Sequence, residues 1–267
     1  MKKLFVDISP GFYKTKLLTE ISKEIDILVV YTTDYDKSTR NQDFMQGDKP
    51  FEYLDLNGSR VIQWLTIAKI ILFGGYDEVI VGGYDNITTW LPILLSPKKR
   101  NSVIVESTFR DTKTKGIRVF LKKLFFKRVS RAYVCGSPHE KLTRMFGFEG
   151  ECIRWNSVGL INRIPQPTYT ERTCVKDFLF VGRLIEEKNL SWLIERFAEH
   201  PELNLTIIGF GPQEDVLKKK VRSNNVTFVG AVNNKELPKW YQSADVFILS
   251  SKSETWGLVV EEALNNG

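Results

Sequence analysis

Short apolar runs alternate with amphipathic stretches along nearly the whole chain, and this alternation limits the folds available to it. In the first half, the runs at residues 4–8 and 27–31 have the length and composition of buried strands. The stretches at residues 13–24 and 59–73 carry apolar side chains at helical spacing. The same alternation restarts near residue 178. This order predicts an α/β fold built on parallel, doubly wound sheets.

A segment without apolar periodicity separates the two halves of this pattern. It contains Pro165, Pro167 and several threonines, a composition typical of a connection between domains. We therefore predict an N-terminal domain over residues 1–160, a linker over residues 161–177 and a C-terminal domain over residues 178–267.

The positive charge of the chain lies in its first half. The net charge is +6, with +8 up to residue 163 and −2 after it. Such an excess indicates a polyanion or an anionic surface as partner. The three cysteines form no C-x-x-C pair, which indicates thiols in a reducing compartment. The apolar run at residues 4–6 is too short for a signal peptide, and Gln63 and Lys69 interrupt the richest apolar run. These features predict a cytoplasmic protein, soluble or peripheral at the inner face of the plasma membrane.

Two glutamates near the end of the chain flank a predicted strand-to-helix turn. A short apolar run predicts a buried strand before Glu254, and helical spacing begins at Gly257 and includes Glu262. Ligands bind at this edge of doubly wound sheets, where the backbone N–H groups of Trp256, Gly257 and Leu258 can hold a phosphate. Carboxylates suit sugar hydroxyls, so the layout favours a nucleotide-sugar. The alternative interpretation is a surface helix with two solvated acids.

The residues from Glu254 to Glu262, Glu-Thr-Trp-Gly-Leu-Val-Val-Glu-Glu, resemble the Glu-x7-Glu motif of glycosyltransferase family 4. Trp256 stands in the usual Phe position of that motif. Phe-Val-Gly-Arg-Leu, followed by Lys188, is similar to the family segment whose Arg and Lys grip the donor diphosphate. Gly209-x-Gly211 and a run ending at Gly230 follow in the family's order. The resemblance implies Glu254 as a catalytic residue that contacts the donor sugar. It also implies these donor-binding residues: Gly182, Arg183, Lys188, Gly209, Gly211, Gly230, Trp256, Gly257, Leu258 and Glu262.

The first domain resembles family 4 more weakly. Many members have a His after the strand that leads into the active site, and a Glu-Ser-Thr run beginning at Glu106 stands there instead. The glycine-rich loop after the first strand is reduced to Ser-Pro-Gly. The resemblance implies Glu106 as a second catalytic candidate. It also implies these candidates on the acceptor side: Gly11, Tyr84, Asp85, Ser107, Thr108 and Arg110.

A basic stretch at residues 113–131 holds eight Lys and Arg residues and no acid. Its apolar residues fall at helical spacing on one face, so a helix packed on the sheet with a solvated basic face is one interpretation. The one-sided charge favours an anionic membrane surface as a further partner.

The resemblance implies two Rossmann-like domains in the GT-B fold and a retaining transferase. Its donor is a nucleotide-sugar co-substrate, with no other cofactor and no metal. The acceptor is a glycan or a lipid-linked molecule, in cell-surface polysaccharide synthesis. A non-catalytic nucleotide-sugar-binding fragment or partner subunit remains an alternative. No full G-x-G-x-x-G follows the first strand of either half, which argues against a dinucleotide-dependent oxidoreductase. The basic residues are not interleaved with a stacking platform, which argues against nucleic-acid binding.

The C-terminal domain is expected to be incomplete. Only four strands are predicted in it, and family members continue with further strands and a closing helix after the Glu-x7-Glu helix. The chain is therefore expected to be a truncated form of a longer enzyme.

Overall fold

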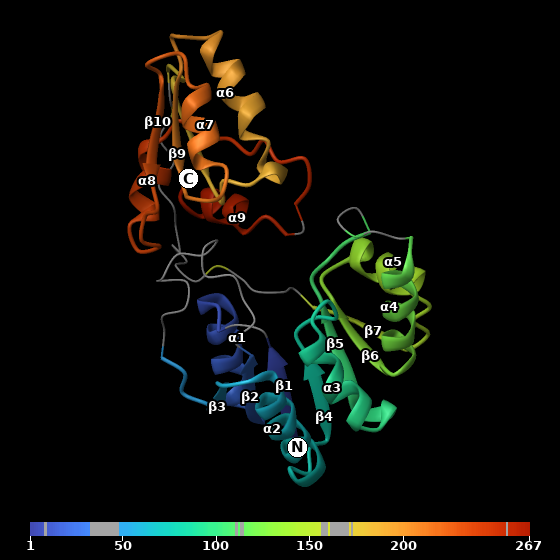
Figure 1. The fold of residues 1–267 in the computed structure, drawn as a ribbon. Helices are drawn as coiled ribbons and strands as arrows, with labels where there is room; N and C mark the ends of the chain where they lie inside the picture. The colour runs from blue at the N-terminus through green and yellow to red at the C-terminus, as the bar shows by residue number, and fades with distance from the viewer. Residues whose placement is uncertain are drawn as a thin grey trace. The chain divides into compact units, whose positions relative to one another are not determined.

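The computed structural model describes residues 1–7, 10–32, 48–109, 112, 115–155, 160, 171, 173–254 and 256–267. These residues divide into two compact units, one within residues 1–159 and one within residues 160–267 (Figure 1). Of the predicted linker, residues 161–170 and 172 lie outside the described part of the chain.

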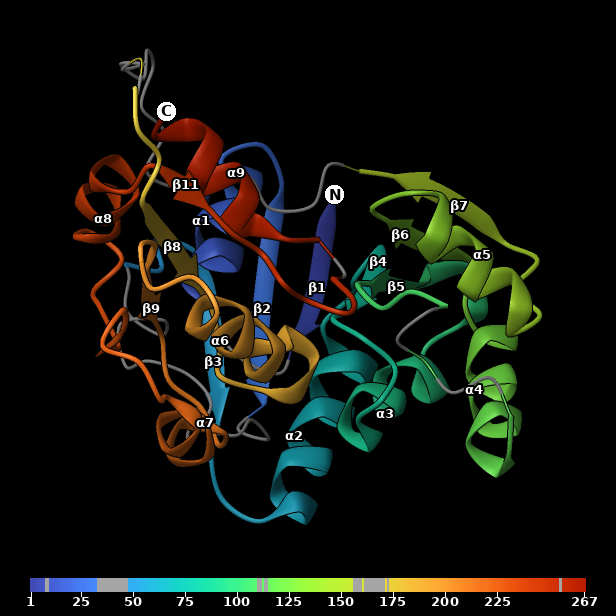
Figure 2. The same ribbon diagram turned by 90° about the horizontal axis from the view of Figure 1, so that it is seen from above.

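The first unit is built on a parallel sheet of order β3-β2-β1-β4-β5-β6-β7. Its strands are β1 (Lys2–Asp7), β2 (Asp26–Thr32), β3 (Glu52–Leu56), β4 (Glu78–Val81), β5 (Asn101–Val105), β6 (Arg131–Val134) and β7 (Glu151–Arg154). Successive strand residues point to opposite faces of the sheet, so each face has its own core. One core includes side chains of α2 (Arg60–Phe73), α3 (Ile87–Leu95), α4 (Ile117–Lys127) and α5 (Ser137–Met145). The other core includes α1 (Phe12–Ser22), which lies across the sheet from those helices (Figure 2).

The second unit repeats this architecture on a smaller parallel sheet of order β10-β9-β8-β11. Its strands are β8 (Asp177–Val181), β9 (Asn204–Ile208), β10 (Val226–Gly230) and β11 (Val246–Phe247). The core on one face includes α6 (Leu190–Ala198) and α7 (Glu214–Lys220). The core on the other face includes α8 (Leu237–Ser243) and α9 (Leu258–Asn265). The predicted α/β class, with two doubly wound sheets of which the second is small, is confirmed.

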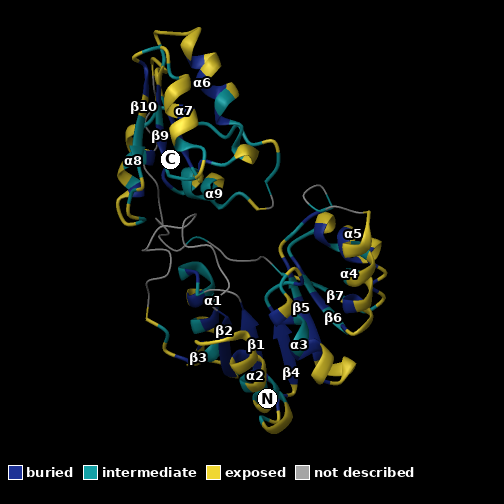
Figure 3. Cartoon of the chain, viewed as in Figure 1, coloured by how far each residue is buried: buried dark blue, intermediate teal, exposed yellow. Residues whose placement is uncertain are grey.

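Most of the deeply buried side chains belong to the strands and to the inner faces of the helices, as Figure 3 shows. Each strand of the parallel sheets is therefore covered on one or both faces, which is why its sequence is a nearly continuous apolar run. β3 and β7, the two edge strands of the first sheet, are exceptions among the described strands. Four of the five β3 residues are exposed, and the β7 residues, Glu-Cys-Ile-Arg, are exposed or half-buried. The sequence analysis did not predict β7.

Two local predictions are wrong in detail. The sequence pattern at residues 137–140 predicts Ser137 as the N-cap of a helix, but α5 already begins at Ser137, with Gly136 as its N-cap and no side-chain capping bond. Glu140 pairs with Arg144 and Arg154 instead of closing a capping box. The apolar spacing predicts a helix over residues 114–129, but α4 begins at Ile117, with Gly116 as its N-cap at a φ of 99°.

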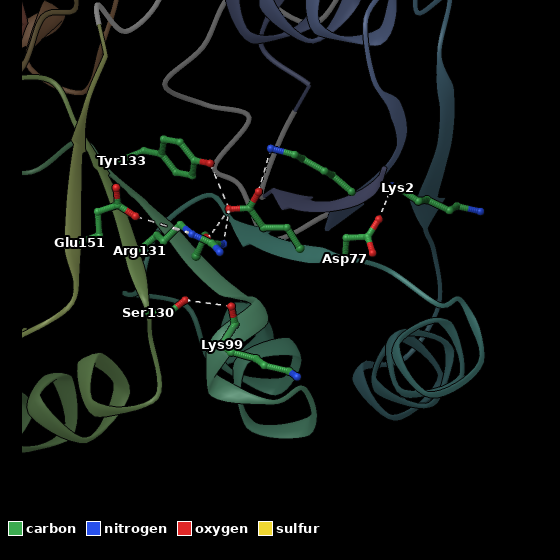
Figure 4. Close-up of polar contacts among 10 residues, drawn as sticks. Lys2, Asp77, Lys99, Ser130, Arg131, Tyr133 and Glu151 are labelled. Atoms are coloured by element: carbon green, nitrogen blue, oxygen red, sulfur yellow. Dashed lines mark hydrogen bonds and ion pairs between the residues drawn. The ribbon is translucent and has the colours of Figure 1, made fainter.

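A buried carboxylate joins four strands of the first sheet. Glu78 of β4 is 5% exposed, and its carboxylate lies 2.8 Å from Lys3 Nζ of β1. It accepts hydrogen bonds from Ser102 Oγ of β5 at 2.5 Å, Tyr133 OH of β6 at 3.0 Å and Arg131 at 3.3 Å (Figure 4). Burial alone would raise the pKa of Glu78, but the bonds from Lys3 and Ser102 outweigh it and lower the pKa.

Candidate functional site

The candidate donor site lies at the carboxyl ends of β8 and β11 in the second unit. These strands are neighbours, yet α6 after β8 and α9 after β11 pack on opposite faces of the sheet. The order of the sheet therefore reverses between them, and ligands of doubly wound folds bind in the crevice at such a point. The loop after β8 contains a 3-10 turn, Glu186–Lys188, and the loop after β11 contains Glu254.

An ion pair links these two loops. Lys188 Nζ donates a hydrogen bond to Glu254 Oε1, and the two side chains are 13% and 25% exposed. Ser251 Oγ donates to the same Glu254 oxygen at 2.6 Å. Ser250 Oγ donates to the backbone carbonyl of Lys188 at 2.7 Å, and the backbone N–H of Lys252 donates to the backbone carbonyl of Glu187 at 2.8 Å. Four contacts thus fix the predicted diphosphate-binding lysine beside the predicted sugar-binding glutamate.

The backbone of both loops is shaped around this pair. Gly257, the N-cap of α9, has a φ of 78°, a left-handed conformation that glycine adopts without strain. α9 begins at Leu258, so its first N–H groups follow Glu254 closely in the chain. Asn189 has a φ of 55° directly after Lys188 and is the only non-glycine residue with a positive φ in the described part of the chain. Such strain is concentrated at ligand sites.

Two glycines after β9 allow its loop to pack on the loop after β8. A Cβ atom on Gly209 would lie 1.8 Å from the carbonyl oxygen of Gly182, and one on Gly211 would lie 2.6 Å from that of Leu184. The backbone N–H of Gly209 donates to Gly230 at 2.8 Å. The close packing of the two loops therefore explains these glycines without a ligand. Their predicted contact with the donor stays a prediction.

The other predicted donor residues lie around the same edge. Arg183 is exposed directly after Gly182, and Trp256 is 37% exposed before α9. Glu262 lies within α9, where its carboxylate accepts a hydrogen bond from Tyr241 OH of α8 at 2.9 Å. Burial is the main cause that raises the pKa of Glu262.

The first unit has a second cluster at the corresponding point of its own sheet. Between β1 and β4 the covering helices change face, and Asp7 ends β1 there. Lys14 of α1 lies 3.1 Å from the Asp7 carboxylate and 3.5 Å from the carboxylate of Glu106, which follows β5. A Cβ atom on Gly82, directly after β4, would lie 2.5 Å from Asp7 Oδ1. Burial opposes the charge of Lys14, but the two acids raise its pKa above the usual value. The sequence analysis identified Glu106 and missed Asp7 and Lys14.

The remaining acceptor-side candidates have different environments. Gly11 is the buried N-cap of α1, Ser107 is half-buried and Thr108 is 5% exposed. Arg110 lies outside the described residues. Asp85 is exposed and pairs with Lys122 Nζ at 2.6 Å.

Tyr84 is a core residue in this structure. It is 3% exposed and its ring packs on Phe125, Phe126 and Phe146. Burial raises the pKa of Tyr84 to about 12. Its position gives it a packing role in the first unit.

Two doubly wound α/β units are the architecture predicted for the GT-B fold, and solved structures of this chain's fold support that class. The crystal structure of the Anabaena protein HepE in complex with UDP matches all of this chain, with a TM-score of 0.68, 17% identity and 79% of that chain covered. At this identity the similarity shows the fold alone.

Residues 168–267 match the family model described as "Glycosyl transferases group 1". This part of the chain belongs to the group 1 glycosyltransferases, family 4, as the Glu-x7-Glu motif implies.

Two relatives show how far the similarity extends. An α-monoglucosyldiacylglycerol synthase of Acholeplasma laidlawii is 39% identical over 94 residues, which cover 32% of this chain and 24% of that enzyme. An uncharacterised 41.2 kDa protein in the cps region of Klebsiella pneumoniae is 36% identical over 220 residues, which cover 75% of this chain and 61% of that protein. The chain thus spans about a quarter of the first relative and less than two thirds of the second.

Proposed function

We propose that this chain takes part in transferring a sugar from a nucleotide-sugar to an acceptor hydroxyl, with retention at the anomeric carbon. The observation that carries the proposal is the Lys188–Glu254 pair at the point where the second sheet reverses its order. The pair would bring a cation for the diphosphate beside a carboxylate for the donor sugar, which are the roles that the family resemblance implies. The membership of residues 168–267 in the group 1 glycosyltransferases supports the same activity.

The geometry of the pair leaves both groups able to bind a donor. An ammonium group has three N–H donors, and only one of those of Lys188 is used by Glu254 Oε1. Both contacts of the Glu254 carboxylate with described residues fall on Oε1, so Oε2 can accept a hydroxyl of the donor sugar. Lys188, Arg183 and the first N–H groups of α9 would surround the diphosphate, as cations and helix N-termini suit phosphate.

These groups stabilise the charge that develops on the departing nucleoside diphosphate. The leaving phosphate oxygen would take the proton of the acceptor hydroxyl on the face where the new bond forms. Glu106, held by Lys14 and 46% exposed, is our candidate for orienting the acceptor. Transfer without a metal stays a prediction.

For the acceptor we propose a glycan or a lipid-linked molecule of cell-surface polysaccharide synthesis. The name of the Acholeplasma relative refers to a diacylglycerol product, and the Klebsiella relative is encoded in a cps region. The surplus of positive charge in the first half of this chain suits an anionic membrane surface.

A panel of UDP-, GDP- and ADP-sugars in a thermal-shift assay tests the proposal, followed by transfer of labelled sugar to membrane lipids. We expect one nucleotide class to raise the melting temperature, with transfer from that donor. Donor binding without transfer to any acceptor would favour the non-catalytic alternative. Absence of binding to every nucleotide-sugar would contradict the proposal altogether.

A further inference from the structure

The outer surface of α2, α3 and α4 has an unusual composition. These helices and the 3-10 turn Lys98–Arg100 contain no aspartate or glutamate. We call their exposed side chains the outer helical face. The three helices cover the same face of the first sheet, and Figure 2 shows them along one side of it. α2 packs on α3, and the Arg128 guanidinium at the end of α4 donates to the Leu94 carbonyl of α3 at 3.1 Å. α3 thus contacts α2 directly and is joined to α4 through Arg128.

Large apolar side chains are exposed on this face. Phe73 is 81% exposed, Ile117 73%, Leu65 66%, Leu72 64%, Val61 63% and Phe120 57%. Helices on the surface of a water-soluble domain usually direct such residues into the core, and contiguous apolar exposure marks an interaction surface. Isolated exposed apolar residues also occur in the second unit, such as Trp192 on α6 and Val216 on α7, and they serve as controls below.

Exposed cations lie among these apolar side chains. They include Lys69, Lys98, Lys99, Arg100, Lys123 and Lys127. Only some cations of the basic stretch predicted at residues 113–131 belong to this face. Lys122 is only 14% exposed and pairs with Asp85, and Arg131 pairs with Glu78. Those two cations are used inside the unit, while the cations of the outer helical face have no acid on their own helices.

We propose that the outer helical face docks on an anionic lipid bilayer. Its apolar side chains enter the interfacial layer, and its cations contact the lipid headgroups. Charge complementarity selects this partner, since a face with cations and no acid attracts an anionic surface along its whole length. A second copy of this chain would present the same cations and would be repelled. The inference deepens the proposed function by placing the chain at a membrane that could carry its acceptor, but the docking itself requires no donor.

Co-sedimentation with vesicles of equimolar phosphatidylcholine and phosphatidylglycerol tests the docking. The chain is expected to bind these vesicles and to bind pure phosphatidylcholine vesicles much more weakly. Leu72→Ser with Phe73→Ser should lower the partition coefficient by about tenfold or more, because two large apolar side chains no longer leave water. The matched control, Trp192→Ser with Val216→Ser, should leave binding unchanged.

The contribution of charge is tested separately. Lys98→Gln, Lys99→Gln and Arg100→Gln together should lower binding by about a hundredfold, since each cation near an anionic leaflet contributes about a fivefold factor. The control changes Lys218, Lys219 and Lys220 of α7 to Gln and should have no effect. UDP affinity, measured without vesicles, should be the same in all four variants, so a failure of docking is distinguished from a failure of the donor site. Three outcomes would overturn the proposal: no binding to anionic vesicles, equal losses in the control variants, or a stable dimer in solution that Phe73→Ser dissociates.

Discussion

Replacing Lys188 by Ala tests the candidate donor site most directly. The Lys188 side chain is 13% exposed and its ammonium group donates to Glu254, so water screens little of its charge. Hydrogen bonds to charged groups are worth about 1.5–3 kcal/mol, so losing one bond to the diphosphate should weaken UDP binding by about ten- to a hundredfold. The change also leaves the Glu254 carboxylate half-buried without its cation, and this negative charge would repel the diphosphate further.

Isothermal titration with UDP and with the matching UDP-sugar measures the effect, assuming that the nucleotide panel selects uridine. Glu254→Gln should weaken binding of the UDP-sugar and leave that of UDP unchanged or slightly stronger, because Lys188 is then released from its partner. Lys252→Ala is the matched control, since Lys252 lies in the same loop with its side chain 60% exposed. If Lys188→Ala binds UDP as the control does, or if Glu254→Gln loses UDP and UDP-sugar equally, the assignment of roles is wrong.

Further predictions concern the second glutamate of the motif, a loop glycine and the buried carboxylate of the first sheet. Glu262→Gln should weaken UDP and UDP-sugar binding alike in the same titrations, and losses confined to the sugar would contradict a ribose contact. Gly209→Ala should destabilise the chain by about 3 kcal/mol or more in urea, because its Cβ atom would meet the Gly182 carbonyl at a φ of 138°. Gly230→Ala, with a φ of 84° but nothing within 4 Å, should cost only about 1 kcal/mol. Glu78→Gln should cost about 2 kcal/mol at neutral pH. Because folding lowers the pKa of Glu78, its contribution is present above the unfolded pKa of about 4.3 and is lost as the pH falls through the folded pKa. The stabilities of the two proteins should therefore converge in acid, and a constant difference down to low pH would contradict this.

Much of the fold could be predicted because a buried parallel strand can be recognised from its own residues alone. A strand such as β2, buried on both faces, appears as an uninterrupted apolar run. β7 could not be found this way. It lies at the end of the first sheet, its residues are exposed or half-buried, and nothing in its four residues distinguishes it from a loop. The starts of α4 and α5 were not predicted correctly either, because they depend on the φ of 99° at Gly116 and on Gly136 as an N-cap, and apolar spacing reveals neither.

The residues of the candidate site were likewise predicted only in part. Glu254 and Glu262 were found because their spacing matches a family motif, and a motif is local. The Lys188–Glu254 bond joins residues 66 positions apart, so no spacing rule could predict that the two predicted roles share one hydrogen bond. Asp7 and Lys14 were missed for the same reason. Asp7 ends an ordinary apolar strand, and its importance depends on β1 lying beside β4 with β5 next in order.

The strand order explains why both clusters lie where they do. In each unit the first strand lies inside the sheet and later strands are added on both of its sides, so the loops after β1 and β8 begin at the point where the order reverses. In both units a lysine of the segment that follows the first strand pairs with a glutamate that follows a later strand: Lys14 with Glu106 and Lys188 with Glu254. The same topology thus brings a cation and a carboxylate together twice, although the residues around them are unrelated in sequence. The pairs differ in one respect that bears on function. Asp7 adds a second acid beside Lys14, so the first cluster has a net negative charge and suits hydroxyl groups, whereas Arg183 follows β8 in the second unit and adds a cation that suits a diphosphate.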